Sequence, residues 1–126
     1  HPNEIKATVE MAKELRDRDE FTGLAIIYQP HQNTRQHKVR EGYADAFLGA
    51  DKVFWLPTFL TREDPNLEIL TPENLISNMY NSDIAEPAEL NEALATKISA
   101  LHKQGWLILL LTAGPADKWL RDNFGE

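Results

Sequence analysis

Short apolar runs recur along the chain, and each is rich in β-branched, aromatic or leucine side chains. The clearest are LAIIY at residues 24–28, KVFWL at 52–56 and WLILLL at 106–111, and a weaker one covers 83–85. Runs without polar alternation predict strands that are buried on both faces, as in a parallel sheet. WLILLL is the most apolar of them, so we expect it to be the most deeply buried strand.

Between these runs, apolar residues recur three and four positions apart, which is the spacing of one helix face. This pattern predicts helices over 2–18, 36–48, 72–79, 87–103 and 116–124. Strands and helices alternate throughout, which indicates an α/β fold. We expect a Rossmann-like three-layer sandwich, with a mostly parallel sheet and helices on both faces.

The composition limits the classes of protein that fit this pattern. With 126 residues, the chain has the length of one domain, and we treat 1–126 as a single unit. A net charge of −7 argues against nucleic acid as a partner. No apolar run is long enough to span a bilayer, and the first residues do not resemble a signal peptide. The absence of cysteine excludes disulfides and thiolate metal sites and fits a cytoplasmic protein.

A polar segment, QPHQNTR at residues 29–35, directly follows the first predicted strand. Ligands of open α/β sheets bind at the carboxyl ends of the strands, which is where this segment would lie. His31, Gln32 and Arg35 are therefore candidate ligand-binding residues, and a guanidinium such as that of Arg35 suits a carboxylate. The alternative is an ordinary solvated loop, since polar residues commonly follow a strand.

A second candidate loop follows the last predicted strand, and it contains Thr112, Ala113 and Gly114. Small residues before a helix let a ligand approach backbone N–H groups, although Pro115 removes one donor. A plain strand-to-helix turn explains the same residues. The segment 57–70 is long for a connection in a compact domain, which is typical of a functional loop.

Other common sites have no counterpart in this sequence. It contains neither GxxxxGK[ST] nor GxGxxG, so no recognised phosphate-binding motif is present. His31 and His37 are six positions apart across a loop, which is a poor spacing for a metal site. We predict no metal site in this chain and no catalytic residue.

Four stretches together resemble a known family. They are HPNEIKAT at residues 1–8, YQPH with the following TR at 28–35, ADKV at 50–53 and LTAG at 111–114. Their order and spacing resemble the C-terminal domain of the Mur ligases of peptidoglycan synthesis. The QPHxxTR loop is most similar to the branch that adds L-alanine to UDP-N-acetylmuramate.

The resemblance implies a three-domain cytoplasmic ligase that uses ATP and Mg²⁺, in which this chain is the amino-acid-binding domain. The N-terminal and central domains would hold UDP-N-acetylmuramate and ATP. The chain alone would then bind neither ATP nor Mg²⁺ and would be inactive.

The resemblance also assigns individual residues. His31 and Arg35 match positions that hold the incoming amino acid and its carboxylate, and Gln32 stands where those enzymes often carry another arginine. Two alternatives remain open: the related ligase that re-attaches recycled tripeptide to UDP-N-acetylmuramate, and a Rossmann-like binding module without catalytic activity.

Overall fold

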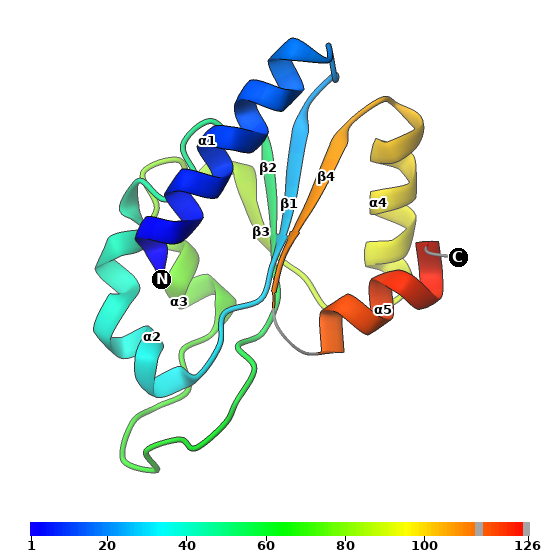
Figure 1. The fold of residues 1–126 in the computed structure, drawn as a ribbon. Helices are drawn as coiled ribbons and strands as arrows, with labels where there is room; N and C mark the ends of the chain where they lie inside the picture. The colour runs from blue at the N-terminus through cyan, green and yellow to red at the C-terminus, as the bar shows by residue number, and fades with distance from the viewer. Residues whose placement is uncertain (113–114, 125–126) are drawn as a thin grey trace.

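The computed structural model describes residues 1–112 and 115–124, and it is a three-layer α/β sandwich (Figure 1). The central sheet has four parallel strands in the order β3-β2-β1-β4. Their bounds are β1 Leu24–Tyr28, β2 Lys52–Trp55, β3 Ala85–Pro87 and β4 Leu107–Leu111. The predicted fold class is therefore confirmed.

Helices cover both faces of the sheet (Figure 1). On one face lie α1 Pro2–Arg18, α2 Asn33–Val39 and α3 Pro72–Ile76. On the other face lie α4 Glu92–Lys103 and α5 Pro115–Phe124. Two short 3₁₀ helices, η1 Arg40–Ala44 and η2 Ser82–Ile84, complete the described elements. No helix in this part of the chain is both long and apolar enough to cross a membrane.

The core has two parts because side chains of a strand alternate between the faces of its sheet. Leu24, Ile26 and Tyr28 of β1 join the cluster under α1 and α3. Ala25 and Ile27 join the cluster under α4 and α5. All five residues are buried, so β1 is the strand that both halves of the core share.

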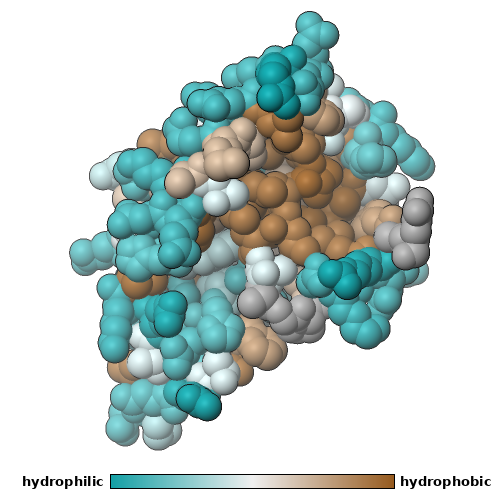
Figure 2. Space-filling model, viewed as in Figure 1, coloured by the Kyte–Doolittle hydropathy of each residue, from teal (hydrophilic) through white to brown (hydrophobic). Residues whose placement is uncertain are grey.

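The prediction that the last strand is the most deeply buried was wrong. All five residues of β4 are half-buried. The reason is topological: β4 lies at the edge of the described sheet and pairs there with β1 alone. Figure 2 shows the resulting apolar surface, which occupies the part of the view where β4 runs between α1 and α4.

The predicted helix over 36–48 was also wrong in its bounds and its continuity. α2 begins three residues earlier, at Asn33, and gives way after Val39 to the 3₁₀ helix η1. Gly42 lies in η1, where a Cβ would stand 3.1 Å from the Pro2 ring, so α1 and η1 approach closely at a residue of low helix propensity.

The predicted helix over 87–103 begins five residues late. Pro87 still belongs to β3, where it pairs with Trp55, and α4 starts at Glu92. The side chain of Asn91 caps α4 by accepting from the backbone N–H of Leu94 at 3.0 Å. The strand expected at 83–85 is likewise displaced to 85–87, and the helix expected over 72–79 ends at Ile76.

Candidate functional site

A pocket of about 350 Å³ opens at the carboxyl ends of β1 and β4. Its lining comes from α1, the end of β1, α2, η1 and the end of β4. His31 and Arg35 of the first candidate loop and Thr112 of the second all line it. The structure therefore brings residues of both candidate loops to one cavity, on the sheet edge where ligands of parallel sheets bind.

Arg35 is the main cationic group of this pocket. It lies in the first turn of α2 and is exposed. Within residues 1–112 and 115–124, its guanidinium has no hydrogen-bond or ion-pair partner. The five N–H donors of this planar group therefore bind no other group in the described residues. Their geometry matches that of a carboxylate ligand.

His31 lines the same pocket as Arg35, and its ring packs against that of Phe59. The two rings stack with centroids 5.8 Å apart and planes 22° apart. His31 also pairs with Phe59 as an isolated parallel bridge, and the flanking backbone bonds, from Phe59 N to Pro30 O and from Gln32 N to Phe59 O, are both 2.8 Å. The ring is exposed and fixed in direction by these contacts.

Gln32, the third predicted binding residue, does not line the pocket. Its φ angle is +66°, in the left-handed region that residues other than glycine seldom adopt. This conformation makes the sharp turn between β1 and α2. Gln32 therefore shapes the loop, while His31 and Arg35 face the cavity.

Glu63, from the long connection 57–70, holds the start of α2. Its carboxylate accepts the backbone N–H groups of Asn33 and Thr34, both at 2.9 Å, and that of Thr61 at 2.8 Å. A carboxylate at a helix N-terminus satisfies orphan donors and complements the helix dipole. Burial pushes the pKa of Glu63 upward, but these hydrogen bonds outweigh it and leave the pKa below 4.5.

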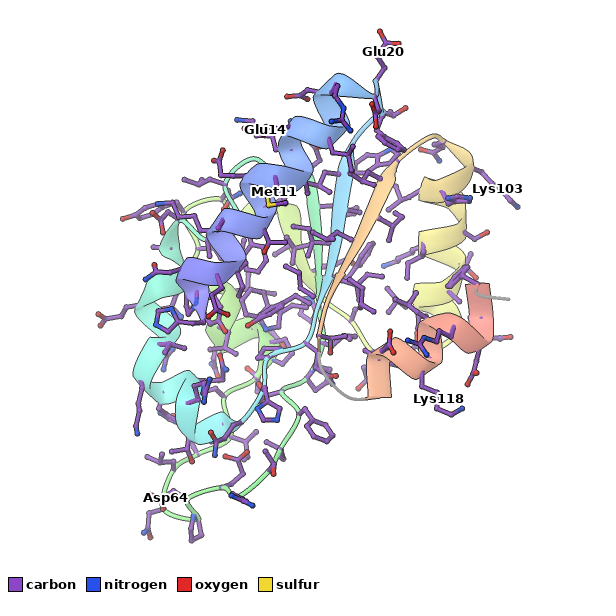
Figure 3. The ribbon with its side chains drawn as sticks, viewed as in Figure 1. Met11, Glu14, Glu20, Asp64, Lys103 and Lys118 are labelled. Atoms are coloured by element: carbon purple, nitrogen blue, oxygen red, sulfur yellow. The ribbon has the colours of Figure 1, made fainter. Side chains whose placement is uncertain are left out.

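The buried side chain of Asn33 ties the same connection to α2 a second time. Its amide donates to Glu68 O at 2.9 Å and accepts from Leu70 N at 2.8 Å. Asp64 lies at the outer tip of the connection, far from the sheet (Figure 3). Neither anchor was predicted, because Glu63 and Asn33 are about 30 residues apart and no local motif links them.

Gln29 joins the ends of three strands. Its backbone N–H donates to Leu111 O at 3.1 Å, and its side-chain amide donates to Pro57 O at 3.1 Å. The hydroxyl of Thr112 donates to its amide oxygen at 3.0 Å. Of the second predicted loop, Thr112 is thus part of the pocket, and Ala113 and Gly114 lie outside the described residues.

Residues of α1 form the remaining wall, and sequence reasoning did not include them among the site residues. His1, Glu4, Ile5 and Thr8 all line the pocket. His1 is the N-cap of α1, and its ring nitrogen Nδ1 accepts the N–H of Asn3 at 3.2 Å. The signal that pointed to them was the resemblance of residues 1–8, which carried no residue roles.

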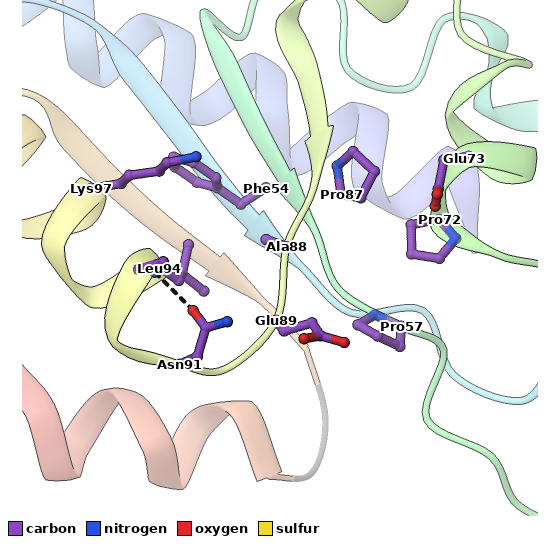
Figure 4. A pocket seen from close by; sticks show the side chains of 11 residues that line it. Phe54, Pro57, Pro72, Glu73, Pro87, Ala88, Glu89, Asn91, Leu94 and Lys97 are labelled. Atoms are coloured by element: carbon purple, nitrogen blue, oxygen red, sulfur yellow. Dashed lines mark hydrogen bonds between the residues drawn. The ribbon is translucent and has the colours of Figure 1, made fainter.

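A second pocket, of about 370 Å³, lies at the ends of β2 and β3 (Figure 4). Pro57, Pro87, Glu89 and Lys97 are among its lining residues, and Figure 4 shows Glu89 beside Pro57. None of the predicted binding residues lines it. The first pocket is therefore the candidate site.

Metal ligation finds no support in the described part of the chain. No group of three or more histidine, aspartate or glutamate side chains is arranged there to hold an ion. His37 Nε2 lies 2.8 Å from Glu68 O, and the His31 ring stacks on Phe59. The two histidines thus have separate partners in the structure.

Known proteins with similar sequences include several that are named UDP-N-acetylmuramate–L-alanine ligase. The enzyme of Rickettsia felis is 30% identical over 130 aligned residues, which cover all of this chain and 27% of the relative. That of Aquifex aeolicus is 28% identical, with 100% and 26% covered. That of Crocosphaera subtropica is 31% identical, with 90% and 22% covered.

No family model matches the chain. The chain spans about a quarter of the length of these relatives, and two of the three alignments run through the whole of it. The similarity therefore includes the strands, the helices and the QPHxxTR turn together, as the sequence resemblance implied. The predicted resemblance to the Mur ligase family is therefore confirmed over the whole chain.

Proposed function

We propose that this chain is the C-terminal, amino-acid-binding domain of a cytoplasmic ligase that joins L-alanine to UDP-N-acetylmuramate in peptidoglycan synthesis. The observation that carries the proposal is the exposed Arg35, which lines the pocket and has no anionic partner among the described residues. The names of the relatives support L-alanine as the amino acid, in preference to a recycled tripeptide.

The pocket offers the groups that a small amino acid requires. The Arg35 fork can hold the α-carboxylate through two parallel hydrogen bonds. His31, fixed by Phe59, flanks the same carboxylate. Ile5, Val39 and Leu111 supply apolar wall for a short side chain. This chain would thus orient the amino acid so that its amine is presented to the other substrate.

ATP and Mg²⁺ belong to the proposed reaction, but the residues of this chain do not fit them. The sequence has no phosphate-binding motif, and the described residues contain no cluster of metal ligands. ATP would supply the phosphoryl group that activates the muramate carboxylate, held by other parts of the enzyme. No step assigned to this chain passes through either group.

Replacing Arg35 by lysine in the full-length protein tests the proposal. Lysine keeps the positive charge but lacks the planar guanidinium, so it cannot form two parallel hydrogen bonds with a carboxylate. Losing a charge-assisted hydrogen bond costs about 1.5–3 kcal/mol. We therefore expect the KM for L-alanine to rise roughly ten- to a hundredfold, at about 1.4 kcal/mol per factor of ten. The KM for ATP should change little.

Arg40→Lys is the matched control, because Arg40 does not line the pocket. His31→Ala should raise the KM for L-alanine less than Arg35→Lys does if His31 only orients the loop. An unchanged KM for L-alanine with unchanged turnover in Arg35→Lys would refute the proposed role. Tripeptide replacing L-alanine as the better substrate would move the assignment to the recycling ligase.

The 126-residue chain by itself should be inactive. It contains no recognised phosphate-binding motif of the kind that ATP chemistry requires. Phosphate release in the presence of ATP, UDP-N-acetylmuramate and L-alanine should stay at background. Turnover by the isolated chain would contradict the assignment of the catalytic residues to other domains.

A further inference from the structure

Three polar side chains that are buried and also line the candidate pocket form a continuous hydrogen-bond chain. The hydroxyls of Tyr28 and Tyr43 lie 2.6 Å apart, and Tyr43 donates to the amide oxygen of Gln36 at 2.5 Å. The amide nitrogen of Gln36 donates to the backbone carbonyl of His31 at 3.0 Å. Tyr28 is 8% exposed, Tyr43 1% and Gln36 2%, so this chain is shielded from solvent.

The available donors and acceptors determine the direction of each hydrogen bond in this series of side chains. The carbonyl of His31 can only accept, so the NH₂ of Gln36 must face it, and the amide oxygen of Gln36 must face Tyr43. Tyr43 then donates to Gln36, and Tyr28 must donate to Tyr43. Burial raises the pKa of Tyr43 to about 12 and that of Tyr28 further, so both phenols keep the protons that this order requires.

The hydrogen-bond chain ends at the turn that contains Gln32. The left-handed conformation of Gln32 is unfavourable for a side chain with a Cβ and persists only where its surroundings enforce it. The Gln36 side chain holds the carbonyl that precedes Gln32, and the Gln36 backbone N–H binds the Gln32 carbonyl at 3.1 Å. Gln36 therefore binds two successive carbonyl groups of the turn, those of His31 and Gln32.

We infer that Gln36 is a positioning residue for the amino-acid site, supported by Tyr43 and Tyr28 through this directed hydrogen-bond chain. By holding the turn, Gln36 keeps His31 and Arg35 facing the same cavity, and the polar chain connects that turn to the aromatic core. This inference rests on the proposed function, since it assigns Gln36 to the site that binds the amino acid.

The test uses Gln36→Met and Tyr43→Phe in the full-length protein. Methionine fills a similar volume without hydrogen bonds, and phenylalanine removes one hydroxyl. Each variant should raise the KM for L-alanine roughly tenfold, the equivalent of about one net hydrogen bond, and leave the KM for ATP within about twofold. The double variant should be no worse than Gln36→Met alone, because both residues act through one chain.

Tyr80→Phe is the matched control for the lost hydroxyl, because the Tyr80 side chain is 78% exposed and does not line the pocket. Equal increases in all KM values, or additive effects in the double variant, would overturn the inference in favour of a merely structural role. Tyr43→Phe is the smaller change and decides the question if Gln36→Met does not fold. Arg35→Lys separates the hypotheses: if only Arg35→Lys raises the KM for L-alanine, the proposed function stands and the role of Gln36 falls.

Discussion

β1 and β4 lie side by side and pair over five residues, yet their surroundings differ throughout. Every residue of β1 is buried, whereas every residue of β4 is half-buried. Both strands are apolar at each position, so composition does not explain the difference. The apolar pattern specifies a strand, and the position of that strand in the sheet specifies how much of it is covered.

The segment that follows β1 is held by residues from other parts of the chain. The turn after β1 is bonded to the connection 57–70 by Glu63 and Asn33 and to the core by Gln36. The described part of the turn after β4 is Thr112, which binds back to Gln29. The fully buried strand β1 is thus followed by a turn that other segments of the chain hold at several points.

The largest effect should come from truncating paired residues of the two strands. Ile26 and Leu109 are register partners on the same face of the sheet, with Ile26 fully buried and Leu109 only partly buried. Ile26→Ala should lower the free energy of unfolding by about 2–5 kcal/mol, and Leu109→Ala by about 1–2 kcal/mol because less area is lost. Urea unfolding of the chain measures both, and equal losses would remove the contrast between the strands.

A smaller effect is expected where β1 and β4 begin. Gly23 directly precedes β1, and a Cβ there would stand 2.8 Å from three atoms of the Trp106 indole. Gly23→Ala must displace that ring and should cost about 1–3 kcal/mol, as overpacking does. Gly42→Ala is the milder comparison, because its Cβ would meet the Pro2 ring at 3.1 Å and requires a smaller displacement. Thermal unfolding compares the two, and a neutral Gly23→Ala would show that the Trp106 side of β4 adapts freely.

The smallest effect concerns the anchored turn and depends on pH. The pKa of Glu63 is lowered in the folded chain, so its stabilising effect is complete above pH 4.5 and is lost as the pH falls through the folded-state pKa. Glu63→Gln should therefore lower the melting temperature at pH 7 and make little difference in strong acid. The exposed Glu14→Gln on α1 is the control. A Glu63→Gln deficit that persists undiminished below the folded-state pKa would contradict an ionic anchor.

The alternation of strands and helices was predictable because it depends on local patterns. The bounds of α1 and β1 agree with the prediction for this reason, and Gly105 ends α4 with the expected positive φ of +84°. The start of α4 was predictable in principle, since Asn91 is a good N-cap, but Pro87 gave a competing signal.

The features of the fold and the site that were not predicted depend on contacts between residues that are distant in the sequence. The chain leaves α2 after Val39 for η1, in which Gly42 packs against Pro2, and the burial of β4 depends on its position at the edge of the described sheet. In the site, His31 and Arg35 were identified from one loop. Glu63 and Tyr43 were not, because their roles arise only when separate segments are brought together by folding.

The strand order has a consequence for the sequence of events during folding. β1, β2 and β3 can pair as they leave the ribosome, but the other edge of β1 pairs with β4, in register from Leu24 with Leu107. That edge must wait until nearly the whole domain has been synthesised. Contacts between such distant residues carry a large loop-closure entropy and form slowly. One edge of the apolar strand β1 therefore stays unpaired longer than the edge that meets β2, and unpaired apolar strand edges of this kind are prone to aggregation.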